Sequence, residues 1–327
     1  MSSTAQDHAH QHSPSIHSPS KHIPSTRNSR LAPLMVLAGA FFWGTTGTAQ
    51  ALAPAGAHPV LVGAVRITVS ALALLLIAIV RNSWNRQAPA ELFKGSPAFL
   101  NPWLLFASLG LAGYQPLFFS AVSLTGVAVG TVVTLGSAPI CSGILDWYLG
   151  RGKPGLVWLV ATALAITGCA VLVFSKGDAT VSPAGILLAV GAGFSFAIYV
   201  GASKQLLAEH ASGAVILPAF LLAALMLSPS WFLFSKAWLL TPRGIAVSLH
   251  LGIVATALAY ILFTRGLQGV RAPTAVTLSM AEPVTASLLG VFFLGELLSV
   301  SALAGILIVF SGLAIVSIGS LRVRTRA

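Results

Sequence analysis

We single out three ionisable side chains inside long apolar segments of this sequence, where a charge is costly and is usually paired or functional. Glu282 lies near the middle of such a segment, directly before Pro283. A carboxyl there would be protonated or paired, which fits a site that takes up and releases protons, or it could satisfy backbone groups that the proline frees. Arg66 could bind the carboxylate of a small molecule or anchor helix carbonyls. His250 titrates in the physiological range, or it is a packed and hydrogen-bonded imidazole.

Polar and aromatic side chains recur at helical spacing in several of the same segments. Trp43, Thr46 and Gln50 fall at i, i+3 and i+7 and share one helix face. Such faces can line a mostly apolar cavity, although threonine and serine also join helices and aromatic rings also mark the membrane interface. On these grounds the candidates for binding a small molecule are Trp43, Thr46, Gln50, Tyr114, Gln115, Tyr199, His250 and Tyr260.

No motif typical of catalysis accompanies these residues. The sequence has no G-x-S-x-G nucleophile motif and no H-E-x-x-H zinc motif, so nothing specific supports the alternative of an intramembrane enzyme. It also has no G-x-x-x-x-G-K-[ST] phosphate loop, and we predict no catalytic residue, no cofactor and no metal site. His8, His10 and His12 alternate in the N-terminal tail, which could bind a metal weakly or simply be solvated.

The composition predicts that the candidate residues lie on membrane-spanning helices. Only 8% of the residues are charged, against roughly 25% in soluble domains. The apolar segments have the length of about twenty residues that crosses a bilayer as a helix. We expect ten spans, at residues 33–53, 60–80, 101–121, 127–148, 154–174, 184–203, 214–234, 243–265, 272–294 and 300–319. The predicted fold class is therefore an all-α integral membrane protein with ten transmembrane helices.

The distribution of basic residues predicts the orientation. With both termini in the cytoplasm, fourteen of the eighteen Lys and Arg lie inside, three lie outside and Arg66 lies within a span. Cytoplasmic loops carry this excess, so the net charge of +11 requires no nucleic-acid partner. We predict a multi-pass protein in contact with the lipid bilayer, with cytoplasmic N- and C-termini and no obligate protein partner.

One stretch of the sequence occurs twice. Residues 125–139 and 268–283 align with a single gap, opposite Glu282, and eight of the fifteen pairs are identical. Basic residues precede the second copy but follow the first, so the two copies should cross the bilayer in opposite directions. The sequence therefore predicts two inverted five-helix repeats, at 32–174 and 184–320, between a disordered tail (1–31) and a basic cytoplasmic tail (321–327).

Both copies end in a proline, Pro139 in the first and Pro283 in the second. A proline inside a helix removes a backbone hydrogen bond and kinks the helix. Because the repeat places the two prolines symmetrically, we expect matched kinks on either side of a central cavity, where they would act as gating hinges.

Several motifs occur in a characteristic order along the spans: Phe41-Phe42-Trp43-Gly44, Arg66 early in the second span, Ala281-Glu282-Pro283 and Leu294-Gly295-Glu296. Together with ten spans in two halves, they resemble the EamA-type members of the bacterial drug/metabolite transporter superfamily over nearly all of residues 32–320. The resemblance implies ten helices around a central cavity and two halves that rock to expose it alternately. It implies small metabolites as substrates, most often amino acids or their derivatives, usually exported across the bacterial cytoplasmic (inner) membrane. In the family pattern a glutamate often follows the glycine at the end of the fourth span. Here that glycine is Gly150, and it is followed by Arg151.

Four functions therefore compete. The first is a secondary-active exporter of small amino-acid-like metabolites, which a proton gradient could drive. The second is an exporter of drugs or quaternary cations, which would use Glu282 with Trp43 and Tyr260. The third is an intramembrane enzyme. The fourth is a non-transporting receptor, for which the sequence shows no sensor domain and which would not explain an inverted repeat.

Overall fold

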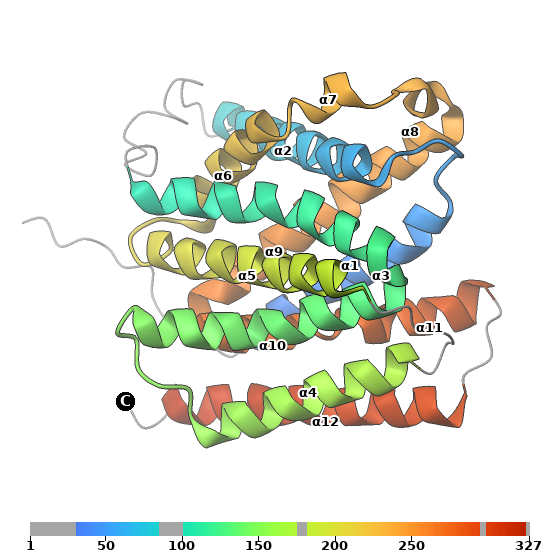
Figure 1. Ribbon diagram of the computed structural model, residues 1–327. Coiled ribbons are helices and arrows are strands. Elements are labelled where there is room, and N and C mark those ends of the chain that lie inside the picture. Colours follow the sequence, from blue (N-terminus) through green and yellow to red (C-terminus); the bar gives the residue numbers. More distant parts are fainter. Residues whose placement is uncertain (1–30, 85–100, 175–181, 295–298, 325–327) are drawn as a thin grey trace, which may run out of the picture.

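The computed structural model of this protein describes residues 31–84, 101–174, 182–294 and 299–324 (Figure 1). Within these ranges every regular element is a helix, so the all-α prediction is confirmed for the described part of the chain. The N-terminal histidines, Glu296 and the side chain of Gln50 were singled out from the sequence and lie outside the described residues.

The first half of the chain contains α1 (Ala32–Ala51), α2 (Pro59–Trp84), α3 (Pro102–Tyr148) and α4 (Leu156–Phe174). Two predicted spans follow one another in α3, which turns at Gly126, where φ is 78° and ψ is 162°. Glycine adopts positive φ without steric cost, so it permits this turn between the two arms of α3. Gly269, the equivalent residue of the second copy, ends helix α9 (Ala259–Gly269).

The second half begins with α5 (Pro183–Leu206), α6 (Ser212–Met226) and the short helices α7 (Ser230–Leu233) and η3 (Ala237–Leu240). The next predicted span consists of α8 (Pro242–Leu249), the π-helical segment η4 (His250–Leu258) and α9. The chain then forms α10 (Ala272–Ser279), α11 (Glu282–Leu294) and α12 (Val300–Arg324), and α12 runs past residue 321, where the sequence predicted the basic tail to begin.

Local sequence explains where several helices begin. Asn101, Ser182 and Thr241 each accept a hydrogen bond from a backbone N–H of the following helix, and each is followed by a proline. These residue types are favoured at the N-cap because their side-chain oxygen satisfies an unpaired donor, and proline suits the first helical position.

The number of membrane spans is confirmed only in part. Seven helical segments in the described residues are long and apolar enough to cross a bilayer, and Ala32–Thr46 and Leu156–Leu172 are shorter apolar helices. Every predicted span coincides largely with helix. The seventh, at 214–234, is divided between α6 and α7, and the ninth, at 272–294, is divided between α10 and α11, neither of which has the length of a span. Ten spans therefore remain a proposal.

The two prolines of the repeat occupy different environments, which corrects the expectation of matched kinks. Pro139 lies inside α3, and in that arm the helical backbone continues through it. In the second copy the helix ends at Ser279, and the N–H groups of Met280 and Ala281 donate to the carbonyls of Thr277 and Leu278, three residues earlier in the chain. A new helix starts at Glu282, so Pro283 lies in its first turn, where the missing N–H costs nothing.

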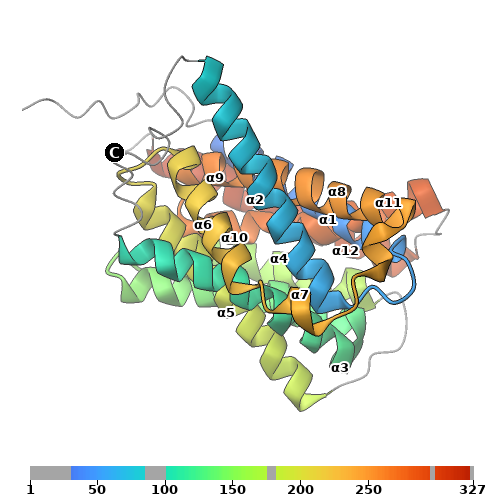
Figure 2. The same cartoon turned by 90° about the horizontal axis from the view of Figure 1, so that it is seen from above.

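The helices of the two halves are interleaved. Figure 1 shows α5 between the two arms of α3, and it packs along both of them. Helix α1 belongs to the first half but packs against α9, α10 and α11 of the second. In the view from above, α2 crosses the bundle obliquely (Figure 2).

Glycine permits the closest helix contacts. A Cβ at Gly168 of α4 would lie 2.8 Å from the Gly305 carbonyl of α12, and a Cβ at Gly305 would lie 2.9 Å from the Gly168 carbonyl. The backbones of α4 and α12 therefore touch, as small residues allow in membrane helices.

Large apolar side chains cover the outer surface of several helices. Leu72 and Leu76 on α2, Val157 on α4 and Leu307 on α12 are all more than half exposed. An apolar surface of this kind matches hydrocarbon rather than water, so these helix faces can contact lipid.

Candidate functional site

Aromatic rings from both halves of the chain meet in one cluster inside the bundle. Trp43 lies 4.9 Å from Tyr260, and Tyr260 lies 5.5 Å from Tyr199 and 5.0 Å from Phe220, each between ring centroids. All three contacts are edge-on, a favourable geometry for aromatic pairs. The aromatic cluster consists of Trp43 (α1), Tyr114 (α3), Phe196 and Tyr199 (α5), Phe220 (α6), and Tyr260 and Phe263 (α9).

Glycines bring α1 close enough for this contact. A Cβ at Gly39 would lie 2.8 Å from the Ala259 carbonyl oxygen of α9. A Cβ at Gly44 would lie 2.8 Å from the Glu282 carbonyl oxygen at the start of α11. Trp43 thus packs its indole ring against α9. The next residue, Gly44, packs its backbone against the start of α11, where the ninth predicted span is broken.

Arg66 supplies a buried positive charge from α2. Its Nε donates a hydrogen bond to Thr256 Oγ1 at 3.0 Å, and the Thr256 hydroxyl donates in turn to the Leu251 carbonyl at 2.6 Å. The guanidinium is therefore anchored through a threonine of the π-helical segment. One helical turn earlier on α2, Gly63 packs against the side chain of Gln115.

The π-helical segment also positions His250. Its Nε2 lies 3.0 Å from Thr45 Oγ1 on α1. The Thr45 hydroxyl already donates to the Phe42 carbonyl at 2.7 Å, so it accepts from His250, whose Nε2 carries the proton. π-Helical turns are frequent at functional sites, and here the π-helical segment forms side-chain contacts with both α1 and α2.

Glu282 supplies a carboxyl group at the start of α11. Its carboxyl interacts electrostatically with Arg66 and also with Tyr114 and Tyr260 of the aromatic cluster. No hydrogen bond or direct ion pair joins it to another side chain within the described ranges. The N-terminal end of a helix carries partial positive charge, which favours an acidic residue at this position. The second interpretation from the sequence was that Glu282 satisfies backbone groups freed by Pro283. In the described part of the chain, its carboxyl forms no hydrogen bond to the backbone that would support this interpretation.

Two further polar atoms in this region have no hydrogen-bond partner among the described residues. They are Thr46 Oγ1 on α1 and Gln115 Oε1 on α3, and both are shielded from solvent. A buried polar atom without a partner is costly, so such atoms call for an explanation, and a binding site is one. Charges of opposite sign, unpaired polar atoms and aromatic rings can together hold a small molecule that is polar at one end and apolar at the other.

The structure brings most of the predicted residues together. Trp43, Tyr114, Tyr199 and Tyr260 belong to the aromatic cluster, and Tyr199 Oη also lies 3.5 Å from Thr264 Oγ1. Arg66, Gln115 and Glu282 lie on the helices beside it. Thr46 follows Trp43 on α1, while His250 contacts Thr45 and not the cluster. Pro139 is separate from these residues in the second arm of α3.

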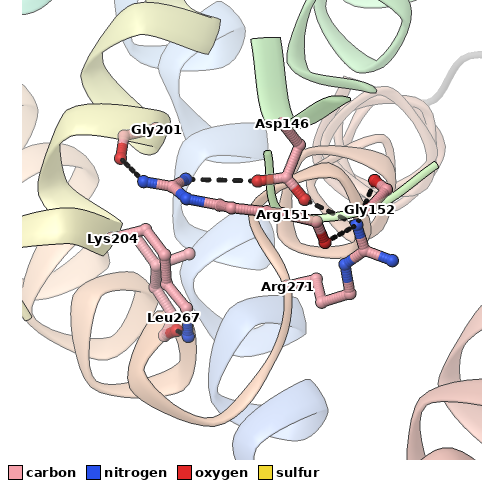
Figure 3. Close-up of polar contacts among 7 residues, drawn as sticks. All are labelled: Asp146, Arg151, Gly152, Gly201, Lys204, Leu267 and Arg271. Atoms are coloured by element: carbon pink, nitrogen blue, oxygen red, sulfur yellow. Dashed lines mark hydrogen bonds and ion pairs between the residues drawn. The ribbon is translucent and has the colours of Figure 1, made fainter. Parts of the chain in front are cut away.

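A charge cluster of three residues was missed in the sequence analysis. Asp146 lies in an apolar segment as Glu282 does, and this shared feature could have marked it. Its carboxylate binds Arg151 Nη1 through Oδ1 at 3.1 Å and Arg271 Nη2 through Oδ2 at 2.8 Å. Figure 3 shows the carboxylate between the two guanidinium groups. The departure from the family pattern at Arg151 thus has a structural explanation, because an arginine there pairs with Asp146.

Comparison with known proteins agrees with these observations. The model of the EamA-like transporter family matches residues 30–174 and 183–318. The chain is 45% identical over 284 residues to the transporter YwfM of Bacillus subtilis, covering 87% of this chain and 93% of that protein. It is 32% identical over 219 residues to the threonine/homoserine exporter RhtA of Escherichia coli K12, covering 62% of this chain and 70% of RhtA.

A solved crystal structure supports the fold. It matches 89% of this chain and 98% of its own with a TM-score of 0.72 at 20% sequence identity. The two segments matched by the family model together span most of the sequence, and the two relatives named above are bacterial transporters. This chain is a multi-pass membrane protein that belongs to the EamA-like transporter family.

Proposed function

We propose that this protein is a secondary-active transporter that exports small amino-acid-like metabolites across the bacterial cytoplasmic membrane. One observation carries the proposal: the Arg66 guanidinium and the Glu282 carboxyl both lie beside the aromatic cluster, close enough to interact electrostatically but not directly paired with each other. A free amino acid carries the complementary pair of charges on adjacent groups. Arg66 would bind its carboxylate, Glu282 would attract its ammonium group, and the aromatic rings would contact its side chain.

Alternating access between two inverted repeats is the proposed mechanism. The aromatic cluster takes Trp43 and Tyr114 from the first half and Tyr199 and Tyr260 from the second, so relative movement of the halves would open it to either side. The break between α10 and α11 ends at Glu282, so protonation of the carboxyl would act where the backbone is interrupted. We assign Glu282 the role of proton coupling on this ground.

The relatives support this substrate class without fixing it. RhtA is named for threonine and homoserine, two small hydroxylated amino acids. Labelled threonine and homoserine are therefore the first probes to use with this protein.

The test compares two arginines of the same helix in inside-out vesicles. Replacing Arg66 by glutamine removes a charged hydrogen-bond donor of the substrate carboxylate, and the KM for labelled threonine should rise about 10- to 100-fold. Arg81→Gln removes an exposed arginine near the end of the same helix and should leave the KM unchanged. Equal KM values for the two variants would rule out Arg66 as the carboxylate site. If the unaltered protein moves neither amino acid nor any other metabolite of a broad panel, the proposed function is wrong.

Export of drugs or quaternary cations is the second candidate, and the contact between Trp43 and Tyr260 beside Glu282 favours it. Aromatic faces and a carboxylate bind organic cations, whereas a positive charge at Arg66 would oppose them. A labelled tetraalkylammonium ion separates the candidates. Cation export would be supported by two results together: the cation is transported faster by Arg66→Gln than by the unaltered protein, and the unaltered protein transports no amino acid.

A further inference from the structure

We propose that the charge cluster of Asp146, Arg151 and Arg271 is a gate that closes one end of the transport path. The distribution of basic residues places this end on the cytoplasmic side. The inference rests on the proposed transport by alternating access, but it concerns a different place in the molecule from the substrate site.

The cluster joins the two halves of the chain through a buried carboxylate. Asp146, on the last turns of α3, is 2% exposed, while the side chains of Arg151 and Arg271 are 20% and 47% exposed. Arg271 directly precedes α10 and also donates to the carbonyls of Arg151 at 3.1 Å and Gly152 at 3.0 Å. Arg151 Nη2 reaches the Gly201 carbonyl of α5 at 3.4 Å (Figure 3). The ends of α3, α5 and α10 are thus held together by charged hydrogen bonds.

The local sequence builds one side of this gate. The end of α3 is closed by two backbone bonds, from Gly150 N–H to the Trp147 carbonyl and from Arg151 N–H to the Asp146 carbonyl, each 3.0 Å. This pair of bonds, with Gly150 at a φ of 70°, is the Schellman arrangement of a helix C-terminus. This motif turns the chain back so that Arg151 lies over the last turn of α3, where its guanidinium contacts the Asp146 carboxylate. Gly152 has a φ of 90°, and its carbonyl accepts from Arg271.

The other side of the gate is attached to the broken span. Arg271 and Glu282 lie just outside the two ends of α10, whose eight residues are all buried. An eight-residue helix is about 12 Å long, and we infer that α10 would shift as a unit. A change at Glu282 that shifts α10 would therefore also shift Arg271 relative to Asp146. This gives the gate a physical connection to the proposed coupling residue.

The repeat has no second charge cluster of this kind. When the two copies are aligned, the positions equivalent to Arg271 and Asp146 are Ala128 and Gly290. Neither carries a charge, so an ionic gate at the opposite end cannot be built from the same positions. The charge cluster is therefore specific to one end of the molecule. A gate would show this asymmetry, whereas a general feature of the repeat would occur at both ends.

Accessibility to a thiol reagent tests the gate without any substrate. Ser142 is buried and lies one helical turn before Asp146 on α3. A Ser142→Cys reporter, in a background with Cys141→Ala and Cys169→Ser, is treated with a membrane-impermeant maleimide in inside-out vesicles. Removing one partner of a buried ion pair destabilises it strongly, so Asp146→Asn should raise the labelling rate at least about tenfold. Arg271→Gln should do the same from the other half of the chain.

Lys153 provides the matched control. Its ammonium lies 5.5 Å from the ring centroid of Trp147, in the same loop as Arg151 but not in the charge cluster. Lys153→Gln should leave the labelling rate unchanged. The gate is overturned if Asp146→Asn and Arg271→Gln both label like Lys153→Gln. If Asp146→Asn does not reach the membrane, the comparison of Arg271→Gln with Lys153→Gln decides the question. Since labelling needs no transported molecule, failure of the flux assays and failure of the gate are separate results.

Discussion

The two copies of the repeated sequence share eight of fifteen aligned residues but have different backbones. In the first copy, the second arm of α3 continues through Pro139. In the second, α10 ends at Ser279, and α11 begins at Glu282 with Pro283 in its first turn. The one residue present only in the second copy is Glu282. The additional residue lies at the point where the span of the second copy is broken and that of the first is continuous.

The difference has a clear physical basis. A proline in a helix interior removes a hydrogen bond and crowds the preceding turn, whereas a proline in the first turn removes nothing. The additional residue allows the chain to end one helix before the proline and to start another with it. The Met280 carbonyl freed in this way lies 3.8 Å from the Cys169 thiol of α4, which is a weak donor. The interruption also places the carboxyl of Glu282 at the start of a helix beside the aromatic cluster.

Deleting Glu282 is the most severe way to test the comparison. The deletion gives the second copy the length of the first, and one residue rotates a helix by about 100°. The contacts of α10 and α11 could then not both be kept, and we expect transport of labelled threonine to fall more than about 100-fold. Glu282→Gln keeps the length and serves as the control for loss of the carboxyl alone. A deletion variant that transports normally would show that the break has no function.

The two prolines should respond differently to substitution. Pro283→Ala restores an N–H that could join α10 to α11, so transport should slow about tenfold as the continuous helix becomes favoured. Pro139→Ala adds a hydrogen bond to a helix that is already continuous, and its transport rate should stay close to that of the unaltered protein. Equal losses in both variants would favour the symmetric hinges expected from the sequence. Normal rates in both would exclude a hinge role for either proline.

The equivalent threonines of the two copies provide the smallest effect. Thr277 Oγ1 donates to the Pro273 carbonyl at 3.0 Å and accepts from Thr162 Oγ1 of α4 at 2.9 Å. Thr134 Oγ1 is buried and has no partner within the described ranges. Thr277→Val should lower the free energy of unfolding by about 0.6–2 kcal/mol, whereas Thr134→Val should not lower it. Thermal unfolding in detergent measures both, and the reverse ranking would contradict the hydrogen-bond assignment.

The sequence predicted those features that depend on local pattern. Runs of apolar residues gave the helical class and the positions of the segments, because the cost of unpaired backbone in lipid leaves few alternatives. Helical spacing and the expense of buried polar groups selected Trp43, Tyr199 and Tyr260, and the repeat selected Tyr114; the fold brings these four residues into one cluster. Nothing beyond residue type and spacing was needed for these predictions.

Features that depend on distant contacts were not predicted. Asp146 and Arg271 are 125 residues apart, and their pairing requires the packing of α3 against α10. The π-helical segment at His250–Leu258 packs against α1 and α2, and its own sequence is that of an ordinary apolar helix, so nothing local predicted it. The break before Glu282 was visible only as a gap in the alignment, and its position at the end of a helix depended on how the chain accommodated Pro283.

The most direct test of the account compares two assays of Glu282→Gln, with the exposed Glu209→Gln as control. In inside-out vesicles, counterflow exchange of labelled threonine needs no proton gradient, while accumulation against a concentration difference does. If Glu282 couples proton movement to transport, Glu282→Gln keeps exchange near the rate of the control and loses gradient-driven accumulation about tenfold or more. Loss of both activities in equal measure, or of neither, would contradict the proposed role of the carboxyl at the break.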